Sequence, residues 1–264
     1  MSDFDFRFGG LGRLFGVEGL ARLQRAHVCV VGIGGVGSWT VEALARSGIG
    51  AITMVDLDEV CVSNVNRQLH ALNSEVGRAK AEVMAARIRE INPECEVRVA
   101  LEFFTAENAE NLLAPHYDFV VDAIDSMTNK CLLIARCHVQ GTPVITCGGA
   151  GGRRDPTQIR VTDLGRTSHD RLLCKVREIL RKQYGFPHGG HPFGVPAVFS
   201  SESPTFPGED GTVCAQRKDA ADGARKLNCD SGYGTASFVT GTFGFVAAGH
   251  VVERIAAGQL ALPV

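Results

Sequence analysis

The sequence predicts an α/β protein with a Rossmann-like fold, in which a mainly parallel sheet carries helices on both faces. Three observations support this prediction. Apolar stretches of strand length alternate with stretches of helical periodicity over most of the 264 residues. The connections between these stretches are short enough for parallel strands joined by crossover helices. The first apolar stretch, VCVVGIGGVG, ends in spaced glycines and leads into a helix, as phosphate-binding turns do.

The composition is that of a globular protein, and we expect one domain spanning residues 1–264. Hydrophobic residues make up 45% of the chain and its formal net charge is -2, so no overall charge attracts nucleic acid. No apolar run reaches the roughly 20 residues of a membrane span, and the N-terminus MSDFDFRFGG does not resemble a secretory signal. The nine cysteines include no CxxC pair, which argues against a disulfide framework or a four-cysteine zinc site. We therefore expect a reducing, cytoplasmic location without membrane contact.

In the first half of the chain, each element is predicted by its own pattern. The N-terminal segment, residues 1–26, has apolar residues at helical spacing over 7–26, which predicts one or two short helices. Runs of β-branched, aromatic and other apolar residues predict strands at 27–32, 51–56, 96–104, 118–125 and 143–149. Helical periodicity predicts helices at 35–47, 75–91, 106–114 and 127–140. These strands and helices form the nucleotide-binding half, residues 27–150.

The pattern changes in the second half, residues 151–264. The stretch QIRVTDL at 158–164 predicts a further strand, and residues 168–184 predict a basic helix. Residues 185–211 are rich in Gly, Pro and Ser, which predicts a long loop with one short apolar run, VPAVFS. The mostly apolar stretch TASFVTGTFGFVAAGHVVERIAAG predicts the final helix.

The glycine loop between the first strand and the first sheet-covering helix indicates a bound nucleotide. Gly32, Gly34 and Gly37 give the pattern GxGxxG. Gly35 lies within the same loop. Such glycines allow a tight turn, close approach of phosphate to the backbone, and close packing of helix on strand. Asp56 ends the second strand, where an acid binds the ribose hydroxyls, and both NAD and ATP fit this pattern.

The residues after the second strand favour ATP. They form a polar cluster of Ser63, Asn64, Asn66, Arg67 and Gln68, followed by Lys80 at the next helix. A dinucleotide carries about two negative charges on phosphate and ATP about four, so ATP needs cationic side chains and a metal. Arg67 and Lys80 suit the phosphates. Asp122 and Asp125 come at the end of the fourth strand, where they offer carboxylates for Mg²⁺.

Taken together, the segments GIGGVG, VDLDEV, SNVNRQ, Lys80 and DAIDS resemble the E1-like adenylating family over about residues 10–150. That family uses ATP to activate carboxylates as acyl-adenylates. The resemblance implies that Asp56 binds the ribose and that Asp125 holds Mg²⁺. It implies that the phosphates contact Ser63, Asn64, Arg67 and Lys80. Arg13 matches an arginine that reaches the ATP of the partner subunit, which implies a homodimer.

Segments of the second half are similar to one branch of that family, the bacterial tRNA threonylcarbamoyladenosine dehydratases. These segments are GGAGGRRDPTQIRVTDLGRTSHDRLLCKVRE, VFSSESP and NCDSGYGTASFVTGTFGFVAAGHVV. The resemblance implies ATP-dependent cyclisation of N6-threonylcarbamoyladenosine at tRNA position 37 through an acyl-adenylate. It leaves open a monovalent cation, Na⁺ or K⁺, near the last helix, and a cysteine desulfurase or sulfur-acceptor protein as partner.

Three groups of residues in the second half each have two interpretations. Over 153–182, basic residues outnumber acidic ones by nine to four, which indicates either a tRNA-backbone contact or an ordinary solvated surface. The contact residues we expect are Arg153, Arg154, Arg171 and Lys175. Cys229 either captures the activated acyl group or is a structural thiol. His188 and His191 either bind a metal or lie in a solvent loop, and the loop is favoured.

Three other functions fit parts of the sequence. An activator of a sulfur-carrier or ubiquitin-like protein C-terminus would share the adenylation chemistry, but the paired CxxC motifs usual in sulfur-carrier activators are absent. A nicotinamide-dependent oxidoreductase would use the glycine loop but leave Arg67, Lys80 and Asp125 unexplained. A non-catalytic scaffold would not need the complete set of charged residues.

Overall fold

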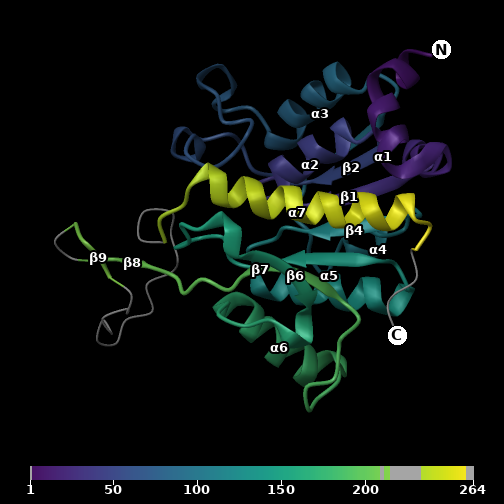
Figure 1. Ribbon diagram of the computed structural model, residues 1–264. Coiled ribbons are helices and arrows are strands. Elements are labelled where there is room, and N and C mark those ends of the chain that lie inside the picture. Colours follow the sequence, from purple (N-terminus) through teal and green to yellow (C-terminus); the bar gives the residue numbers. More distant parts are fainter. Residues whose placement is uncertain (1, 209–210, 215–232, 260–264) are drawn as a thin grey trace.

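The computed structural model describes residues 2–208, 211–214 and 233–259, and its centre is a seven-stranded sheet (Figure 1). The strand order is β3-β2-β1-β4-β5-β7-β6. The strands are β1 (His27–Val31), β2 (Ala51–Val55), β3 (Glu96–Ala100), β4 (Phe119–Asp122), β5 (Val144–Cys147), β6 (Ile159–Asp163) and β7 (Pro196–Ser200). Neighbouring strands run parallel except for β6, which is antiparallel to β7. This confirms the mainly parallel sheet that the sequence predicts.

The chain order in the sheet reverses at β1. Strands β2 and β3 lie on one side of it, whereas β4 and β5 lie on the other. Open parallel sheets bind ligands at such a reversal, beyond the carboxyl ends of the strands. Val31 at the end of β1 pairs with both Val55 and Asp122, so the loops after β1, β2 and β4 leave the sheet together.

Helices cover both faces of the sheet (Figure 1). One face carries α1 (Asp3–Arg25), α2 (Gly37–Arg46), α3 (Lys80–Ile91) and α7 (Ser237–Ala256). The other face carries α4 (Ala109–Leu112), α5 (Met127–Gln140) and α6 (Arg171–Tyr184). An apolar core lies under each layer, which explains why the central strands are apolar on both faces. Among the described residues, no helix has the length and apolar character that a membrane span needs.

The last helix, α7, lies across the middle of the sheet and packs closely against α2 (Figure 1). A Cβ atom at Gly244 would lie 2.7 Å from the Val36 carbonyl oxygen and 2.7 Å from Trp39 Cβ, so only glycine permits this approach. The same helix contacts α1 and the strands β5, β6 and β7. Its mostly apolar sequence is therefore explained by burial within the domain.

Most predicted elements are present, but several are shorter than their patterns. Helix α1 is confirmed and is kinked at Gly16, where φ is 79°. Helix α3 begins at Lys80 and not at 75, because Gly77 has a φ of 84° and Glu59 pairs with Ala79 in a short bridge. Strand β3 ends at Ala100, four residues before its predicted end, and α4 covers only part of 106–114.

The prediction of one continuous loop over 185–211 needs a correction. The run VPAVFS contains β7, which lies inside the sheet between β5 and β6, and a two-residue strand, β8 (Phe206–Pro207), follows it. β8 pairs with β9 (Val213–Cys214). Five residues of mainly apolar sequence are enough for a buried parallel strand, and Pro196 is tolerated because it stands at the strand's first position. The division of the chain at residues 26 and 150 stays a prediction.

Candidate nucleotide site

The glycine loop follows β1 and requires glycine at two positions for steric reasons. Gly32 has a φ of 90°, and a Cβ atom there would lie 2.7 Å from the Ala123 carbonyl oxygen. A Cβ atom at Gly37 would lie 1.8 Å from the Gly32 carbonyl oxygen, so Gly37 brings α2 against the loop. Gly34 and Gly35 line the cavity, and Gly37 does not. The loop thus exposes backbone toward a ligand at the start of α2.

Asp56 holds this loop in place. Its Oδ2 accepts a hydrogen bond from the Ile33 N–H at 2.5 Å, and its Oδ1 accepts one from the Asp58 N–H at 2.8 Å. Burial raises the pKa of Asp56, whereas these two donors and Lys80 oppose the shift. A carboxylate has about four acceptor positions, so it can also accept from ribose hydroxyls.

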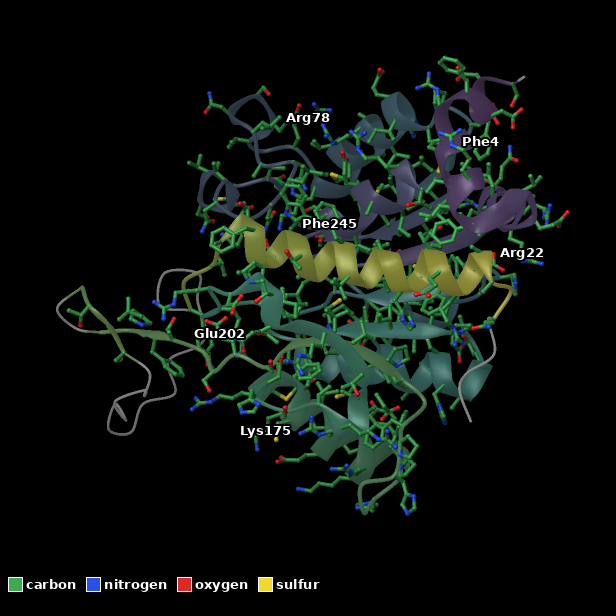
Figure 2. All side chains as sticks on the ribbon, in the orientation of Figure 1. Phe4, Arg22, Arg78, Lys175, Glu202 and Phe245 are labelled. Carbon is green, nitrogen blue, oxygen red and sulfur yellow. The ribbon has the colours of Figure 1, made fainter. Side chains whose placement is uncertain are left out.

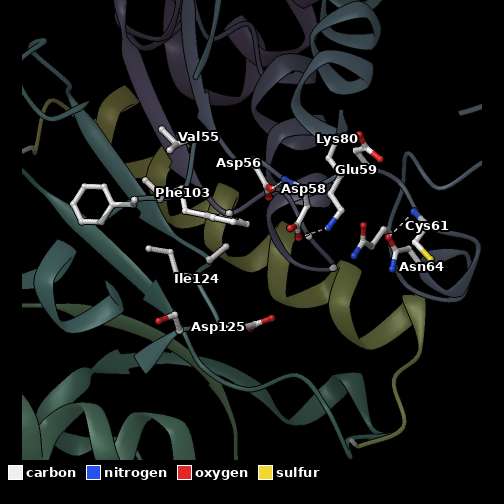
Figure 3. A pocket seen from close by; sticks show the side chains of 18 of the residues that line it. Val55, Asp56, Asp58, Glu59, Cys61, Asn64, Lys80, Phe103, Ile124 and Asp125 are labelled. Atoms are coloured by element: carbon white, nitrogen blue, oxygen red, sulfur yellow. Dashed lines mark hydrogen bonds and ion pairs between the residues drawn. The ribbon is translucent and has the colours of Figure 1, made fainter. Parts of the chain in front are cut away.

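A cavity of about 570 Å³ lies at the carboxyl ends of β1, β2 and β4 (Figure 3). Its volume is in the range of small-molecule sites. The structure brings together in its lining nine of the residues predicted from sequence: Gly32, Gly34, Gly35, Asp56, Ser63, Asn64, Arg67, Lys80 and Asp125. The residues come from segments far apart in the chain, and the reversal of strand order at β1 explains why they meet.

Lys80 provides a buried cation at this cavity. Its side chain is 7% exposed, and its Nζ lies 2.7 Å from Asp58 Oδ2 (Figure 3). Asp58 is 51% exposed and faces the cavity, so a more strongly charged anion has access to the same ammonium group. Replacing Asp58 by phosphate oxygens would keep the buried charge paired, which buried charges require.

Arg67 is positioned by two helices. Its carbonyl oxygen accepts hydrogen bonds from Trp39 Nε1 on α2 at 3.1 Å and from Thr240 Oγ1 on α7 at 3.0 Å. Its Nη1 donates to the Ser63 carbonyl oxygen at 2.6 Å. Asn64 is buried, and its Oδ1 accepts from the Cys61 N–H at 3.0 Å. The polar loop is thus fixed by its own side chains before any ligand binds.

The two acids after β4 have different environments. Asp122 is fully buried and pairs with Lys130 Nζ at 2.8 Å, and Thr146 Oγ1 donates to the same carboxylate at 2.6 Å. Asp125 is exposed to solvent within the cavity. Loss of hydration next to the surrounding protein raises the pKa of Asp125, and the positive charges of Lys130, Arg67 and Lys80 oppose this effect. Asp125 is therefore the acid available to a ligand, and Asp122 is structural.

The cavity lining contains carboxylates of the kind that hold divalent cations. No group of three His, Cys, Asp or Glu side chains suited to a metal occurs in residues 2–208, 211–214 and 233–259. Mg²⁺ is commonly held by one or two carboxylates together with substrate phosphates and water. Asp125, with Asp58 and Glu59 in the same lining, supplies such carboxylates.

The sequence pattern missed the apolar wall of the cavity. Phe103, Phe104 and Ile124 line it, and Phe103 is 52% exposed (Figure 3). Sequence periodicity extends the third strand to residue 104, but the strand ends at Ala100. Both phenylalanines therefore lie beyond the strand end, where they line the cavity. Two adjacent aromatic residues at a predicted strand end were the available signal. The exposed ring of Phe103 suits a planar base, whereas Phe104 is largely buried.

Several predicted residues lie away from the cavity. Arg13 is exposed on α1 and does not line it, and His188 and His191 are exposed in the loop after α6. Cys229 lies outside the described residues. The eight cysteines among the described residues have free thiols, and five of them are buried.

The four expected tRNA contacts divide into two kinds. Arg154, Arg171 and Lys175 are exposed. Arg153 is only 4% exposed, so the structure corrects the expectation that it is a surface residue. Its guanidinium is turned inward, where its Nη2 donates to the His169 carbonyl oxygen.

The chain matches the model of the ThiF family over residues 11–259. It is 53% identical over 252 residues to an Escherichia coli (strain K12) protein named tRNA threonylcarbamoyladenosine dehydratase, with 95% of this chain and 94% of that protein covered. A Haemophilus influenzae protein of the same name is 46% identical, with 97% and 95% covered. The crystal structure of the E. coli tRNA N6-threonylcarbamoyladenosine dehydratase in complex with ATP has a TM-score of 0.86 and 48% identity, with 97% of each chain covered. These similarities include both halves of the chain.

Proposed function

The chain belongs to the ThiF family of E1-like proteins, and from this premise we propose that it catalyses the ATP-dependent dehydration of N6-threonylcarbamoyladenosine at tRNA position 37. One observation carries the proposal. The glycine loop, two cationic side chains and an available acid converge on one cavity, in a chain similar over nearly its whole length to proteins of that activity.

The chemistry of the cavity lining suggests how ATP is oriented in it. The aromatic wall with Phe103 receives adenine, and Asp56 accepts from the ribose hydroxyls. The glycine loop and the start of α2 receive phosphate. Arg67 and Lys80, with Ser63 and Asn64, contact the triphosphate.

The reaction has two steps, and no protein nucleophile is required. A carboxylate oxygen of the threonylcarbamoyl side chain attacks the α-phosphorus of ATP, and pyrophosphate leaves. The ureido group of the same side chain then attacks the activated carbonyl carbon, the carbon–oxygen bond to phosphate breaks, and AMP leaves. The ureido proton is released, so the nucleoside loses one water in total. The protein mainly orients one flexible side chain and stabilises charge at phosphorus.

Lys80 and Asp125 have separate tasks in this scheme. Lys80 pairs with phosphate oxygens in place of Asp58. It thereby stabilises the negative charge that develops at the α-phosphorus. Asp125 would hold Mg²⁺, which when bound would neutralise the phosphates. A monovalent cation near α7 stays a prediction, as does acyl capture by Cys229.

A homodimer is part of the proposal, because Arg13 would complete the partner's site. Exposed apolar side chains on the same helix support it: Phe6 is 84%, Leu14 71% and Val17 81% exposed. Large apolar side chains on one helix usually mark an interaction surface. On this basis α1 packs against a second copy of the chain and carries Arg13 with it.

The tRNA surface is proposed to include Arg154, Arg171 and Lys175 at the outside of the second half. Lys175 lies on α6, on the far side of the sheet from α1 (Figure 2). Arg171 lies 5.3 Å above the ring of Phe206, and Lys175 Nζ lies 2.9 Å from Glu178. Such exposed pairs are weak, so phosphate can replace the acid. A tRNA substrate accords with a cytoplasmic location, and a cysteine desulfurase or sulfur-acceptor partner stays a prediction.

The test is mass analysis of nucleosides from tRNA incubated with the protein and ATP. Threonylcarbamoyladenosine should become lighter by one water, and AMP should accumulate in equal amount. An activator of a sulfur carrier would instead exchange pyrophosphate with ATP only when given the carrier protein. Exchange with a carrier and none with modified tRNA would reject the proposal in favour of that alternative.

A further inference from the structure

Arg153 stands apart from the exposed arginines near it in the sequence. It is 4% exposed, and its Nη2 donates to the His169 carbonyl oxygen at 2.5 Å. Its Nε and Nη1 are buried and have no hydrogen-bond partner among the described residues. A buried guanidinium with unused donors is unfavourable unless another molecule supplies acceptors.

Two carboxylates lie near Arg153, and neither is hydrogen-bonded to its guanidinium in the described part of the chain. Burial lowers the pKa of Arg153, and the charges of Asp170 and Glu202 oppose that effect. The carboxylate of Asp170 accepts from the backbone N–H groups of Gly149 and Leu173, both at 2.9 Å. One oxygen of Glu202 accepts two further backbone N–H groups at 2.9 Å (Figure 2). Both acids accept from the backbone, and Nε and Nη1 of Arg153 have no hydrogen-bond partner among the described residues.

The backbone around Arg153 is under local constraint. His169, which supplies the single carbonyl acceptor, has a φ of 55°, the only positive φ of a non-glycine residue in the described part of the chain. Such strain occurs often at functional sites. Tyr233 packs on the two glycines before Arg153, since a Cβ atom at either Gly151 or Gly152 would lie 2.8 Å from it. Tyr233 is only partly buried, so this segment lies at the surface of the domain.

Arg153 does not line the cavity, but its segment leaves the sheet beside the segment that leads to Asp125. Asp122 of β4 pairs with Thr146 of β5, so the segments after these two strands leave the sheet side by side. The first leads to Asp125 and the second, through the glycines at 148–152, leads to Arg153. Both side chains therefore belong to the same edge of the sheet.

We propose that Arg153 binds the carboxylate of the threonylcarbamoyl side chain and so selects modified tRNA. The inference rests on the proposed function and names a substrate-recognition residue within it. The modification adds one anionic group to the base, a carboxylate, and guanidinium groups bind carboxylates with short, charge-assisted hydrogen bonds. Arg153 thereby reads the modification, whereas the exposed residues contact the backbone that all tRNAs share.

The experiment compares binding of tRNA that carries threonylcarbamoyladenosine with binding of the same tRNA carrying unmodified adenosine. The variants are Arg153→Met and Arg153→Lys, with Arg154→Met as the matched exposed control. In Arg153→Met the preference for modified tRNA should fall by about tenfold or more, the usual effect of losing hydrogen bonds to a charged group. Arg153→Lys should keep part of the preference, because it keeps the charge. Arg154→Met should weaken binding of the modified and the unmodified tRNA equally. ATP affinity should not change in any variant.

Three results would overturn the inference. If Arg153→Met weakens binding of the modified and the unmodified tRNA equally, the ligand of Arg153 is a backbone phosphate. If the preference is unchanged in a folded Arg153→Met protein, Arg153 has no ligand in the substrate. Should the Met variant fail to fold, an unchanged preference in Arg153→Lys overturns it as well. Failure of the wild-type protein to dehydrate modified tRNA rejects the proposed function instead, so the two failures are distinct.

Discussion

The charged residues of the nucleotide half and of the second half differ in what they contact. In the nucleotide half, Asp56 accepts from two backbone N–H groups and Lys80 pairs with Asp58 at 2.7 Å. In the second half, Arg171 is exposed above an aromatic ring and Arg153 has two unpaired nitrogens. The first half is ordered in advance for a small ligand, which lowers the cost of binding it. In the second half, we expect Arg171 and Arg153 to contact a large ligand instead.

The strongest test of this comparison replaces one lysine in each half. We expect Lys80→Met to reduce AMP formation on the order of a hundredfold, because it removes a cation aimed at developing phosphate charge. Lys175→Met is the matched control, and it should leave AMP formation at saturating tRNA close to the wild-type rate. Equal reduction in both variants would mean that the two halves do not differ in the way described.

The next test asks whether one site is completed by a second chain. Arg13→Ala and Lys80→Ala should each be inactive alone. Mixed together they should regain activity, to less than half of the wild-type level, because each mixed dimer holds one intact site. AMP formation by the mixture is the measurement, and differently tagged chains show separately that subunits exchange. Recovered activity would mean that Arg13 completes the site of the partner chain. If activity does not recover although subunits exchange, Arg13 acts in the site of its own chain or has no role in the reaction.

A smaller effect is expected from the tRNA surface. The double variant Arg171→Ala with Lys175→Ala should bind tRNA several-fold more weakly at moderate salt. Its log–log dependence on salt should flatten by roughly one unit for each phosphate group that the variant no longer neutralises. Binding of ATP should be unchanged, and a salt series with tRNA provides the measurement. If the salt dependence of tRNA binding is unchanged and ATP binding is weakened, Arg171 and Lys175 contribute to nucleotide binding and not to tRNA binding.

The smallest effect is a pH dependence of stability in the nucleotide half. Burial, with a smaller contribution from Lys80, lowers the pKa of His70 to about 4. The unfolded chain therefore binds a proton below pH 6.5 that the folded chain rejects, so stability is full above that pH and falls as pH decreases toward 4. The decrease is at most about 3 kcal/mol, since one pKa unit corresponds to about 1.4 kcal/mol. Denaturant titrations of His70→Gln between pH 4 and 7 should show a shallower decline, and an identical decline would contradict this assignment.

Sequence patterns are sufficient where chemistry is local in the chain. Gly32, Asp56 and Lys80 are found from sequence because each has a fixed place next to a strand or a helix start. Strand β7 is missed as a strand because five residues have too little periodicity, and only its neighbours in the sheet define it. The burial of Arg153 is missed because it depends on His169 and Glu202, which are distant in sequence. Residues that act through long-range contacts leave no local pattern.

The contact between Thr240 and the Arg67 carbonyl oxygen has a consequence for the order in which the protein is made. Asn66 also donates to the carbonyl oxygen of Thr235, just before α7, at 2.9 Å, so the polar loop is held both by α7 and by the segment that leads into it. Ribosomes deliver α7 last, after every other strand and helix of the domain. A nascent chain therefore exposes its glycine loop long before it can hold Arg67 in position. A chain truncated before α7 lacks the hydrogen bond that Thr240 donates to the Arg67 carbonyl oxygen, so its polar loop is not held in the same way.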